Sequence, residues 1–285
     1  MVRRVFINGL LQGLFQGLAW ALLAGFFGLA LVPLVLMILA SLLPEITGPG
    51  SLSALFAPQH WQLGAYAQIF RQLPVATYAL NSVLVSVVTT AGYTLFAAMA
   101  GYALARLPVR YKSLWFWLIL LTLMIPPQVN IVPLFLLMAK AGLINSIWAL
   151  IIPGLFGAFG VFLMRQWFSD FPVSLQESAA LDGCSASQTF WKIALPTARP
   201  VLVSLALWIF MATWNAFLWP LVATHADAAR TLPVGLAALK ASFRDGMDWP
   251  VLLAAATITV LPVLMLAIIG QKAWLSATLA GGVKE

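Results

Sequence analysis

Long stretches without a charged side chain constrain this chain more than any other feature. Six of them are long enough to cross a bilayer, because a spanning helix needs about 20 apolar residues. They contain no Asp, Glu, Lys or Arg, apart from Arg165 near the end of the fourth. The sequence therefore predicts an all-α polytopic membrane protein with six transmembrane helices, at approximately residues 18–43, 76–104, 113–138, 146–168, 200–222 and 250–271.

The composition excludes a soluble globular domain. Of the 285 residues, 62% are hydrophobic and only 8% are charged, whereas soluble domains carry about 25% charged residues. The net charge of +7 comes from basic residues scattered between the apolar stretches, so the chain lacks the clustered basic stripe of a nucleic-acid interface. The single cysteine, Cys184, excludes an internal disulfide and a metal site built from cysteines.

The distribution of basic residues predicts the orientation in the membrane. Ten of the 15 Lys and Arg residues fall on one side of the six-helix topology and five on the other. Because cytoplasmic loops are enriched in Lys and Arg, both termini are expected in the cytoplasm. The first apolar stretch, at about 26 residues, exceeds the 7–15 residues of a signal peptide. We therefore expect an uncleaved first helix after a cytoplasmic N-terminal segment, residues 1–17.

The long cytoplasmic loop at residues 169–199 carries signals for two short helices. A capping box begins at Ser174, and its helix is expected to end in a left-handed turn at Gly183. A second capping box begins at Ser185, and its helix is expected to end at Pro196. A loop that only connects two spans does not need two capped helices. The loop is therefore predicted to form a docking surface for another protein.

This loop also resembles the E-A-A-x-x-x-G-x(9)-I-x-L-P signature of ABC importer permeases, with Ser178 where alanine is usual. In that family the two helices are coupling helices that sit in a cleft of the ATPase subunit. Glu177 has a second possible role, as the partner of Ser174 in the capping box, and the two roles are compatible. The resemblance implies an ATPase-docking site at Glu177, Ser178, Ala179, Ala180, Asp182, Gly183, Ile193, Leu195 and Pro196.

Other blocks along the chain resemble the carbohydrate branch of the same family. They lie at residues 81–86, 101–106, 124–135, 214–221 and 231–236, and the ending at 279–284 is similar to that of the smaller permease of maltose-type importers. The resemblance implies a type I ABC importer permease (methionine-permease-like) fold. The corresponding domain is expected at residues 18–285, with its core at about 76–272, the coupling loop at 169–199 and a C-terminal tail at 273–285.

The resemblance implies the function and the partners. The chain is expected to be the permease subunit of an ATP-driven, binding-protein-dependent sugar importer that works by alternating access. Its implied partners are a second, homologous permease, two ATPase subunits, an extracytoplasmic solute-binding protein and lipid of a bacterial or archaeal cytoplasmic membrane. The chain has no G-x-x-x-x-G-K-[ST] loop, so we expect no enzyme activity and no bound cofactor, with ATP and magnesium held by the ATPase subunits.

Two alternatives remain open. Within the family, the solute could be glycerol phosphate or a polyol. In a different class, the chain could be an ATP-independent secondary facilitator or channel. That class predicts buried charges or selectivity rings, which the spans lack, and it does not account for the two-helix cytoplasmic loop.

Amide side chains within the spans are candidates for the translocation path, because an unpaired amide in hydrocarbon is costly. Such amides either hydrogen-bond sugar hydroxyls or join helices. The proline pair at 126–127 must break the third helix, and broken helices are tolerated where they line a cavity, although a packing kink is an equal alternative. His60 and His225 lack metal-ligand spacing, so no metal site is expected. The candidates are Asn81, Gln128, Asn130 and Asn215.

The C-terminal residues 276–285 are expected to be non-helical. They are too polar and glycine-rich to extend the sixth helix. A frayed terminus is one interpretation. The resemblance to the smaller maltose-type permease implies another, in which this tail reaches between the ATPase subunits.

Overall fold

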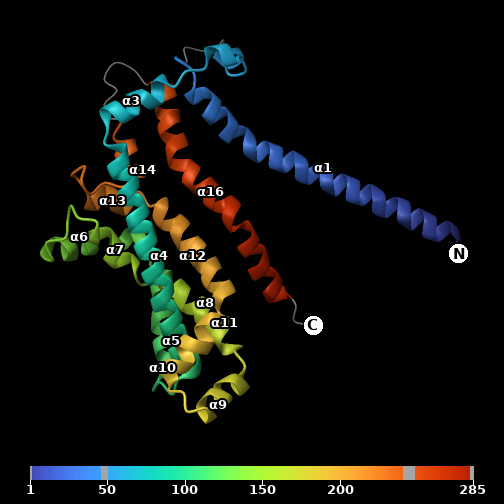
Figure 1. The fold of residues 1–285 in the computed structure, drawn as a ribbon, viewed down its shortest axis with the longest axis vertical. Helices are drawn as coiled ribbons and strands as arrows, with labels where there is room; N and C mark the ends of the chain where they lie inside the picture. Colours follow the sequence, from blue (N-terminus) through green and yellow to red (C-terminus); the bar gives the residue numbers. More distant parts are fainter. Residues whose placement is uncertain (1, 46–50, 240–247, 283–285) are drawn as a thin grey trace. The chain divides into compact units, whose positions relative to one another are not determined.

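Every regular element in the described part of the chain is a helix. The computed structural model describes residues 2–45, 51–239 and 248–282 (Figure 1). The first elements are α1 (Val2–Ser41), α2 (Ser51–Ala54), η1 (Pro58–His60), α3 (Gly64–Gln72) and α4 (Val75–Arg106). They are followed by α5 (Lys112–Leu121), η2 (Thr122–Met124), η3 (Pro127–Asn130), α6 (Ile131–Lys140), α7 (Trp148–Gly154) and α8 (Ala158–Ser169). The remaining elements are α9 (Val173–Leu181), α10 (Ala186–Thr189), the π-helical turn η4 (Phe190–Ala194), α11 (Leu195–Thr197), α12 (Arg199–Trp214), α13 (Leu218–Ala223), α14 (Leu232–Ala237) and α16 (Trp249–Gly282).

The helices supply the membrane spans that the sequence predicts. Four apolar segments are long enough to cross a bilayer, and each of two bent helix pairs supplies one more span if it is counted as a unit. Across the described residues this gives up to six spans. The all-α membrane fold is confirmed. The single segments are Phe15–Ser41, Val75–Arg106, Trp148–Ser169 and Trp249–Gln271, and the bent pairs are Lys112–Met124 with Pro127–Lys140 and Ala186–Thr197 with Arg199–Trp214.

The chain divides into two compact units. The first contains Met1–Gln72 and Leu239–Ile258, and the second contains Leu73–Ala238 and Thr259–Glu285. In the first unit a small apolar core of Ala40, Leu43 and Leu55 joins the end of α1 to the segment after α2. The second unit holds all the candidate site residues that the sequence predicts.

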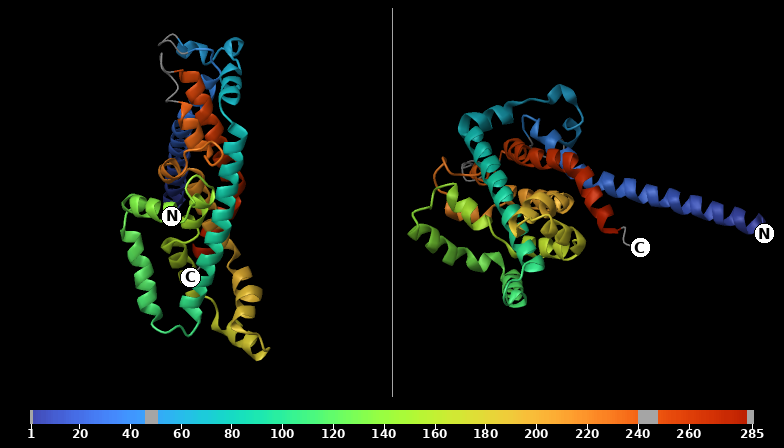
Figure 2. Two further views of the ribbon diagram at one scale, coloured as in Figure 1. Left: turned by 90° about the vertical axis from the view of Figure 1, so that its left-hand side faces the viewer. Right: turned by 60° about the horizontal axis from the view of Figure 1, so that its bottom comes forward.

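The third predicted span breaks at its proline pair, as expected. Its two halves, Lys112–Met124 and Pro127–Lys140, meet at an angle of 92°, and Figure 2 shows the corner between α5 and α6. Proline has no backbone N–H and its ring clashes with the preceding turn, so the helix cannot continue through residues 126–127.

The fifth predicted span, 200–222, is not one helix, and this expectation is wrong. The helix α12 ends at Trp214, and α13 begins only at Leu218. Pro220 cannot donate the hydrogen bond that would continue the ladder. The carbonyl of Met211 accepts both the backbone N–H of Asn215 at 3.1 Å and the Nδ2 of the same residue at 2.8 Å, so Asn215 closes the end of α12.

The fourth span is interrupted near Pro153 for the same reason, between α7 and α8. Pro153 leaves the carbonyl of Ala149 without its helical donor. The indole Nε1 of Trp219, on α13, donates to that carbonyl at 3.0 Å. The carbonyl that the break leaves free is therefore hydrogen-bonded by a neighbouring helix.

The C-terminal helix is longer than predicted. α16 continues to Gly282, so the expectation that residues 276–285 are non-helical is wrong for residues 276–282. Ala277, Leu279 and Ala280 are strong helix formers, and they outweigh the two glycines at the end. At the other terminus α1 extends back to Val2 and includes most of the predicted N-terminal segment 1–17.

The second unit is organised around α4, which packs mainly against α8 and α12. At the α4–α8 crossing the glycine at 101 lets the backbones approach closely. A Cβ on Gly101 would lie 2.6 Å from the Cβ of Met164 and 2.7 Å from the backbone nitrogen of Arg165. This tight contact fixes α4 against α8, the helix that leads into the loop at 169–199.

Candidate functional site

The segment between α8 and α12 forms two short helices joined by a glycine turn, as predicted. Gly183 has φ of +79°, in the left-handed region that only glycine adopts at low cost. The backbone N–H of Cys184 donates to the carbonyl of Ala179 at 2.9 Å, and that of Gly183 donates to Ala180 at 3.1 Å. These two bonds are the Schellman arrangement that ends a helix.

The second capping box is confirmed. The backbone N–H of Ser185 donates to Oε1 of Gln188 at 2.8 Å, and the N–H of Gln188 donates to Oγ of Ser185 at 3.3 Å. These bonds fix the start of α10 directly after the glycine turn.

The first capping box, at Ser174 and Glu177, is wrong. α9 begins at Val173, directly after Pro172, which has φ of −59°. Ser174 therefore lies inside the first turn and makes no capping hydrogen bond. Because the fixed φ of the proline suits the entry to a helix, the helix starts earlier than the box predicts. Glu177 is exposed and does not cap the helix, which removes the structural role that the sequence offered for it.

The exposed residues at the end of α9 and in its glycine turn form what we call the elbow surface. It contains Glu177, Ser178, Ala180, Leu181, Asp182 and Gly183. Ala179, which the sequence also assigned to the docking site, is only 3% exposed and packs inside the chain. The small residues that remain exposed here are Ser178 and Ala180.

Sequence reasoning missed the apolar part of the elbow surface. The side chain of Leu181 is 89% exposed, and Leu175 and Trp191 in the same loop are also exposed. Exposed apolar side chains among polar residues are typical of surfaces that contact another protein or the membrane. The signal was present as a leucine directly before the helix-ending Asp-Gly pair.

Two other predicted docking residues, Ile193 and Leu195, also connect the elbow to the rest of the chain. Both are half-buried and pack against a core that is shared by α4, α8 and the π-helical turn. In this core the ring of Tyr102 lies 5.3 Å from that of Phe168 and 5.2 Å from that of Phe190. Pro196 remains exposed. The elbow is thus attached to α4 and α8 through a buried aromatic cluster.

Arg106, the last residue of α4, ties α4 to the start of the elbow. Its Nε donates to the carbonyl of Phe168 at 2.6 Å, and its Nη2 donates to Ser169 at 3.0 Å and also to Phe171. These carbonyls lie at and beyond the C-terminus of α8, where a cation is favoured. In the sequence, Arg106 is one of the basic residues that predict the orientation. Its position in the 101–106 block gives no sign of these hydrogen bonds.

The four predicted path residues occupy different environments. Gln128 and Asn130 are exposed on η3, which leads into α6. Asn215 is exposed at the break that precedes α13. Since α6 and α13 are in contact, the breaks of the third and fifth spans lead into neighbouring elements. Asn81 differs, because its Nδ2 donates to the carbonyls of Ala228 and Arg230 at 2.9 and 3.0 Å.

Asn81 therefore belongs to a set of contacts that holds the loop before α14 on α4. The hydroxyl of Tyr78 donates to Oδ1 of Asp227 at 2.7 Å, and Arg230 forms an ion pair with the same oxygen at 2.8 Å. The backbone N–H of Leu232 donates to the hydroxyl of Ser82 at 2.7 Å. α14 and this loop lie at the opposite end of α4 from α9 and α10 (Figure 1).

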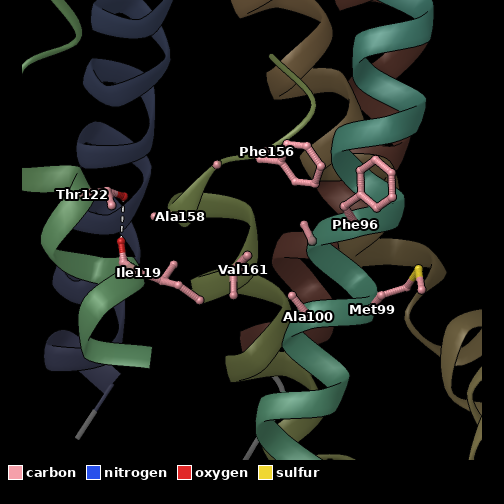
Figure 3. A pocket seen from close by; sticks show the side chains of 10 residues that line it. Phe96, Met99, Ala100, Ile119, Thr122, Phe156, Ala158 and Val161 are labelled. Carbon is pink, nitrogen blue, oxygen red and sulfur yellow. Dashed lines mark hydrogen bonds between the residues drawn. The ribbon is translucent and has the colours of Figure 1, made fainter. Parts of the chain in front are cut away.

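An apolar cavity of about 590 Å³ lies between α4, α5 and α8 (Figure 3). Phe96, Ala100, Ile119, Phe156 and Val161 are among its lining residues. The lining offers no free side-chain amide, acid or base, so the cavity lacks the groups that would bind a sugar. It is distinct from the breaks at which the candidate path residues lie.

The comparisons with known proteins agree on one family. The profile of the family described as "Binding-protein-dependent transport system inner membrane component" matches residues 94–275. The arabinooligosaccharides transport system permease protein AraQ of Halalkalibacterium halodurans is 36% identical over 273 residues, which cover 94% of this chain and 97% of AraQ. The sulfoquinovosyl glycerol transport system permease protein SmoH of Agrobacterium fabrum is 33% identical over 224 residues, covering 78% of each chain.

Two further similarities bear on solute and fold. The sn-glycerol-3-phosphate transport system permease protein UgpE of Yersinia pestis is 31% identical over 199 residues, which cover 70% of this chain and 71% of UgpE. The fold matches, with a TM-score of 0.79 and 23% identity, a chain of a bacterial ABC transporter involved in the import of the acidic polysaccharide alginate, covering 90% of this chain and 95% of that one. The fold, the two-helix elbow and these matches agree: the chain belongs to the inner membrane components of binding-protein-dependent transport systems, and it is a permease subunit of an ABC importer.

Proposed function

We propose that this chain is one of two homologous permease subunits in an ATP-driven importer of small, uncharged oligosaccharides. The observation that carries the proposal is the 36% identity to an arabinooligosaccharide permease over nearly the full length of both chains. The other proposed subunits are two ATPases, which hold ATP and magnesium, and an extracytoplasmic binding protein that delivers the sugar. The chain itself binds no cofactor in this scheme.

The elbow surface is the proposed contact with the ATPase. Glu177 and Asp182 offer carboxylates to basic residues of the partner, Ser178 and Ala180 let the backbones approach, and Leu181 supplies an apolar anchor. Closure of the ATPase pair on ATP would carry the elbow with it. Because the aromatic cluster and Arg106 attach the elbow to α4 and α8, the spans would follow and alternate between outward and inward access.

The orientation follows from the same arrangement. The elbow must face the cytoplasm to meet an ATPase, and both termini are then cytoplasmic. The loop before α14, held on α4 by Asn81 and Tyr78, would lie on the outer side. That position suits a contact with the binding protein.

The charge of the spans favours a sugar over glycerol phosphate. Residues 113–139 and 200–222, which contain Gln128, Asn130 and Asn215, include no Lys or Arg. Phosphate is recognised in proteins by charge-assisted hydrogen bonds from such cations, whereas amides suffice for sugar hydroxyls. The similarity to a glycerol-phosphate permease makes that solute the second candidate.

The binding protein that copurifies with the complex provides the test. Calorimetric titration of that protein with arabino-oligosaccharides, other oligosaccharides and glycerol 3-phosphate identifies the solute, and uptake into proteoliposomes is then measured with and without ATP. We expect oligosaccharide binding and ATP-dependent uptake. Binding of glycerol 3-phosphate alone would contradict the sugar assignment, and equal uptake without ATP would contradict the coupling.

A further inference from the structure

We propose that the apolar cavity between α4, α5 and α8 holds an acyl chain of an anionic phospholipid, whose phosphate is held by Arg165 and Lys112. The lipid would come from the leaflet at the elbow end of the protein. The assignment of that leaflet to the cytoplasmic side rests on the proposed orientation, but the site itself does not depend on which solute is transported.

The chemistry of the cavity suits hydrocarbon. Its volume of about 590 Å³ is within the usual range of small-molecule sites, about 300–1,000 Å³. It is lined by residues of the spanning segments, mostly alanine, valine, isoleucine and phenylalanine (Figure 3). The hydroxyl of Thr122, which also lines it, already donates to the carbonyl of Ile119 at 2.7 Å. The cavity therefore offers apolar contact at membrane depth and no free polar side chain for a solute.

Two helix faces lead from the cavity to cations at the elbow end. On α8, Arg165 follows the lining residue Val161 by four positions, and on α5, Lys112 and Phe116 precede the lining residue Ile119. Residues three and four apart share a helix face. Each face thus begins with a cation near the membrane surface and continues into the cavity, which is the order of headgroup and acyl chain in a phospholipid.

Arg165 joins the two faces and lacks a protein anion. Its guanidinium carbon lies 3.9 Å from the centre of the Phe116 ring, so it bridges α8 and α5 beside the cavity. Its Nε is buried without a hydrogen-bond partner. Among the described residues, the side-chain ion pair is the one between Arg230 and Asp227. Arg165 therefore has no carboxylate partner there. By contrast, Arg110 lies over the ring of its neighbour Tyr111 and hydrogen-bonds its hydroxyl.

Charge complementarity selects a lipid rather than a protein helix as the occupant. An apolar helix of the second permease laid over the cavity would also bury Arg165 without a counter-charge, and burying an unpaired charge is costly. A phosphodiester supplies that counter-charge. Basic pockets between transmembrane helices on the cytoplasmic side bind anionic lipid headgroups in other membrane proteins.

The test uses the whole transporter complex in nanodiscs with a phosphatidylglycerol that carries a photoactivatable group on its acyl chain. We expect cross-links, mapped by mass spectrometry, on residues 96–100, 119–122 and 156–161. Unlabelled phosphatidylglycerol should compete for these sites better than phosphatidylcholine. Arg165→Gln should weaken that competition by about fivefold, the effect of one cation near an anionic surface.

Control variants separate the site from general lipid contact. Arg199→Gln removes a cation on α12, away from the cavity lining, and should leave the cross-links unchanged. Val161→Phe and the milder Ala100→Leu fill the cavity and should remove the cross-links while the complex stays assembled. Equal competition by the two lipids with no effect of Arg165→Gln would overturn the proposal. So would an absence of cross-links at these residues in the wild-type complex, which would mean that another subunit covers the cavity.

Discussion

At Gly183 the shape of the elbow depends on one backbone angle. The φ of +79° is left-handed, and a Cβ placed there would meet no atom within 4 Å. The cost of a substitution is therefore conformational and not steric. It is small for asparagine, which visits this region, and large for a β-branched residue.

We expect Gly183→Val to lower ATP-driven uptake per complex strongly, because the strained turn moves the elbow surface away from its docking position. Gly183→Asn is the matched control and should retain most of the uptake. Both variants should remain inserted, since the turn lies outside the spans. Uptake by Gly183→Val equal to that of the parent would show that the turn geometry is not needed.

Arg106 is the second residue with a specific expectation. Its guanidinium donates to three carbonyls at and beyond the end of α8. A hydrogen bond to a charged group typically contributes about 1.5–3 kcal/mol to stability. Arg106→Gln should lower the number of sugars transported per ATP hydrolysed, because the elbow is no longer tied to α4.

The control for this variant is Arg110→Gln, since Arg110 is exposed and its guanidinium hydrogen-bonds to and stacks on its own neighbour, Tyr111. Each variant removes one cation from the segment 106–110. A difference in coupling between them therefore reports the loss of the Arg106 hydrogen bonds and not the loss of a charge. If the two variants show the same coupling ratio, Arg106 has no part in transmission.

At the scale of elements, packing at the α4–α8 crossing sets a limit on residue size. The Cβ of an alanine at 101 would approach backbone atoms of α8, which cannot move as a flexible side chain can. Overpacking of this kind typically costs about 1–3 kcal/mol. We expect Gly101→Ala to lower the melting temperature of the purified complex and Gly64→Ala, which has open space, to leave it unchanged. Equal melting temperatures would mean that the two helices separate more easily than the contact suggests.

The sequence predicted most of the elements because hydrophobic length and proline position act locally. The charge-free stretches place the spans, the proline pair at 126–127 breaks the third helix, and Gly183 ends α9. The capping pattern at Ser174 predicted the wrong start for α9, because Pro172 already begins the helix two residues earlier. The sequence did not predict the interruption after Asn215. A single proline, such as Pro220, also occurs within uninterrupted transmembrane helices.

In the candidate site, the features that the sequence did not predict depend on contacts with other parts of the chain. Exposure of Glu177 and burial of Ala179 could not be separated from sequence, because both fit one short helix and only the contact with the rest of the chain distinguishes them. The role of Asn81 likewise depends on the carbonyls of Ala228 and Arg230, about 150 residues away in the chain. Such long-range hydrogen bonds leave no pattern in one sequence.

At the scale of the whole molecule, the orientation in the membrane is the first expectation. In a variant without Cys184, cysteines introduced at Ser187 and Ala226, which are both exposed, should react with impermeant reagents from opposite faces. Ala226 should be labelled from outside intact cells and Ser187 only after the cells are opened. Labelling of both positions from one face would contradict the proposed topology.

The central claim is that the elbow surface docks on the ATPase subunit. Site-specific photo-crosslinking in the intact complex tests it most directly, with the photoreactive amino acid at Leu181 and at Ser178, and with Ala226 as the control position. We expect a covalent product of this chain with the ATPase subunit from both elbow positions and none from Ala226. Cross-links from Leu181 and Ser178 only to lipid or to this chain itself, in a complex that still transports, would contradict it.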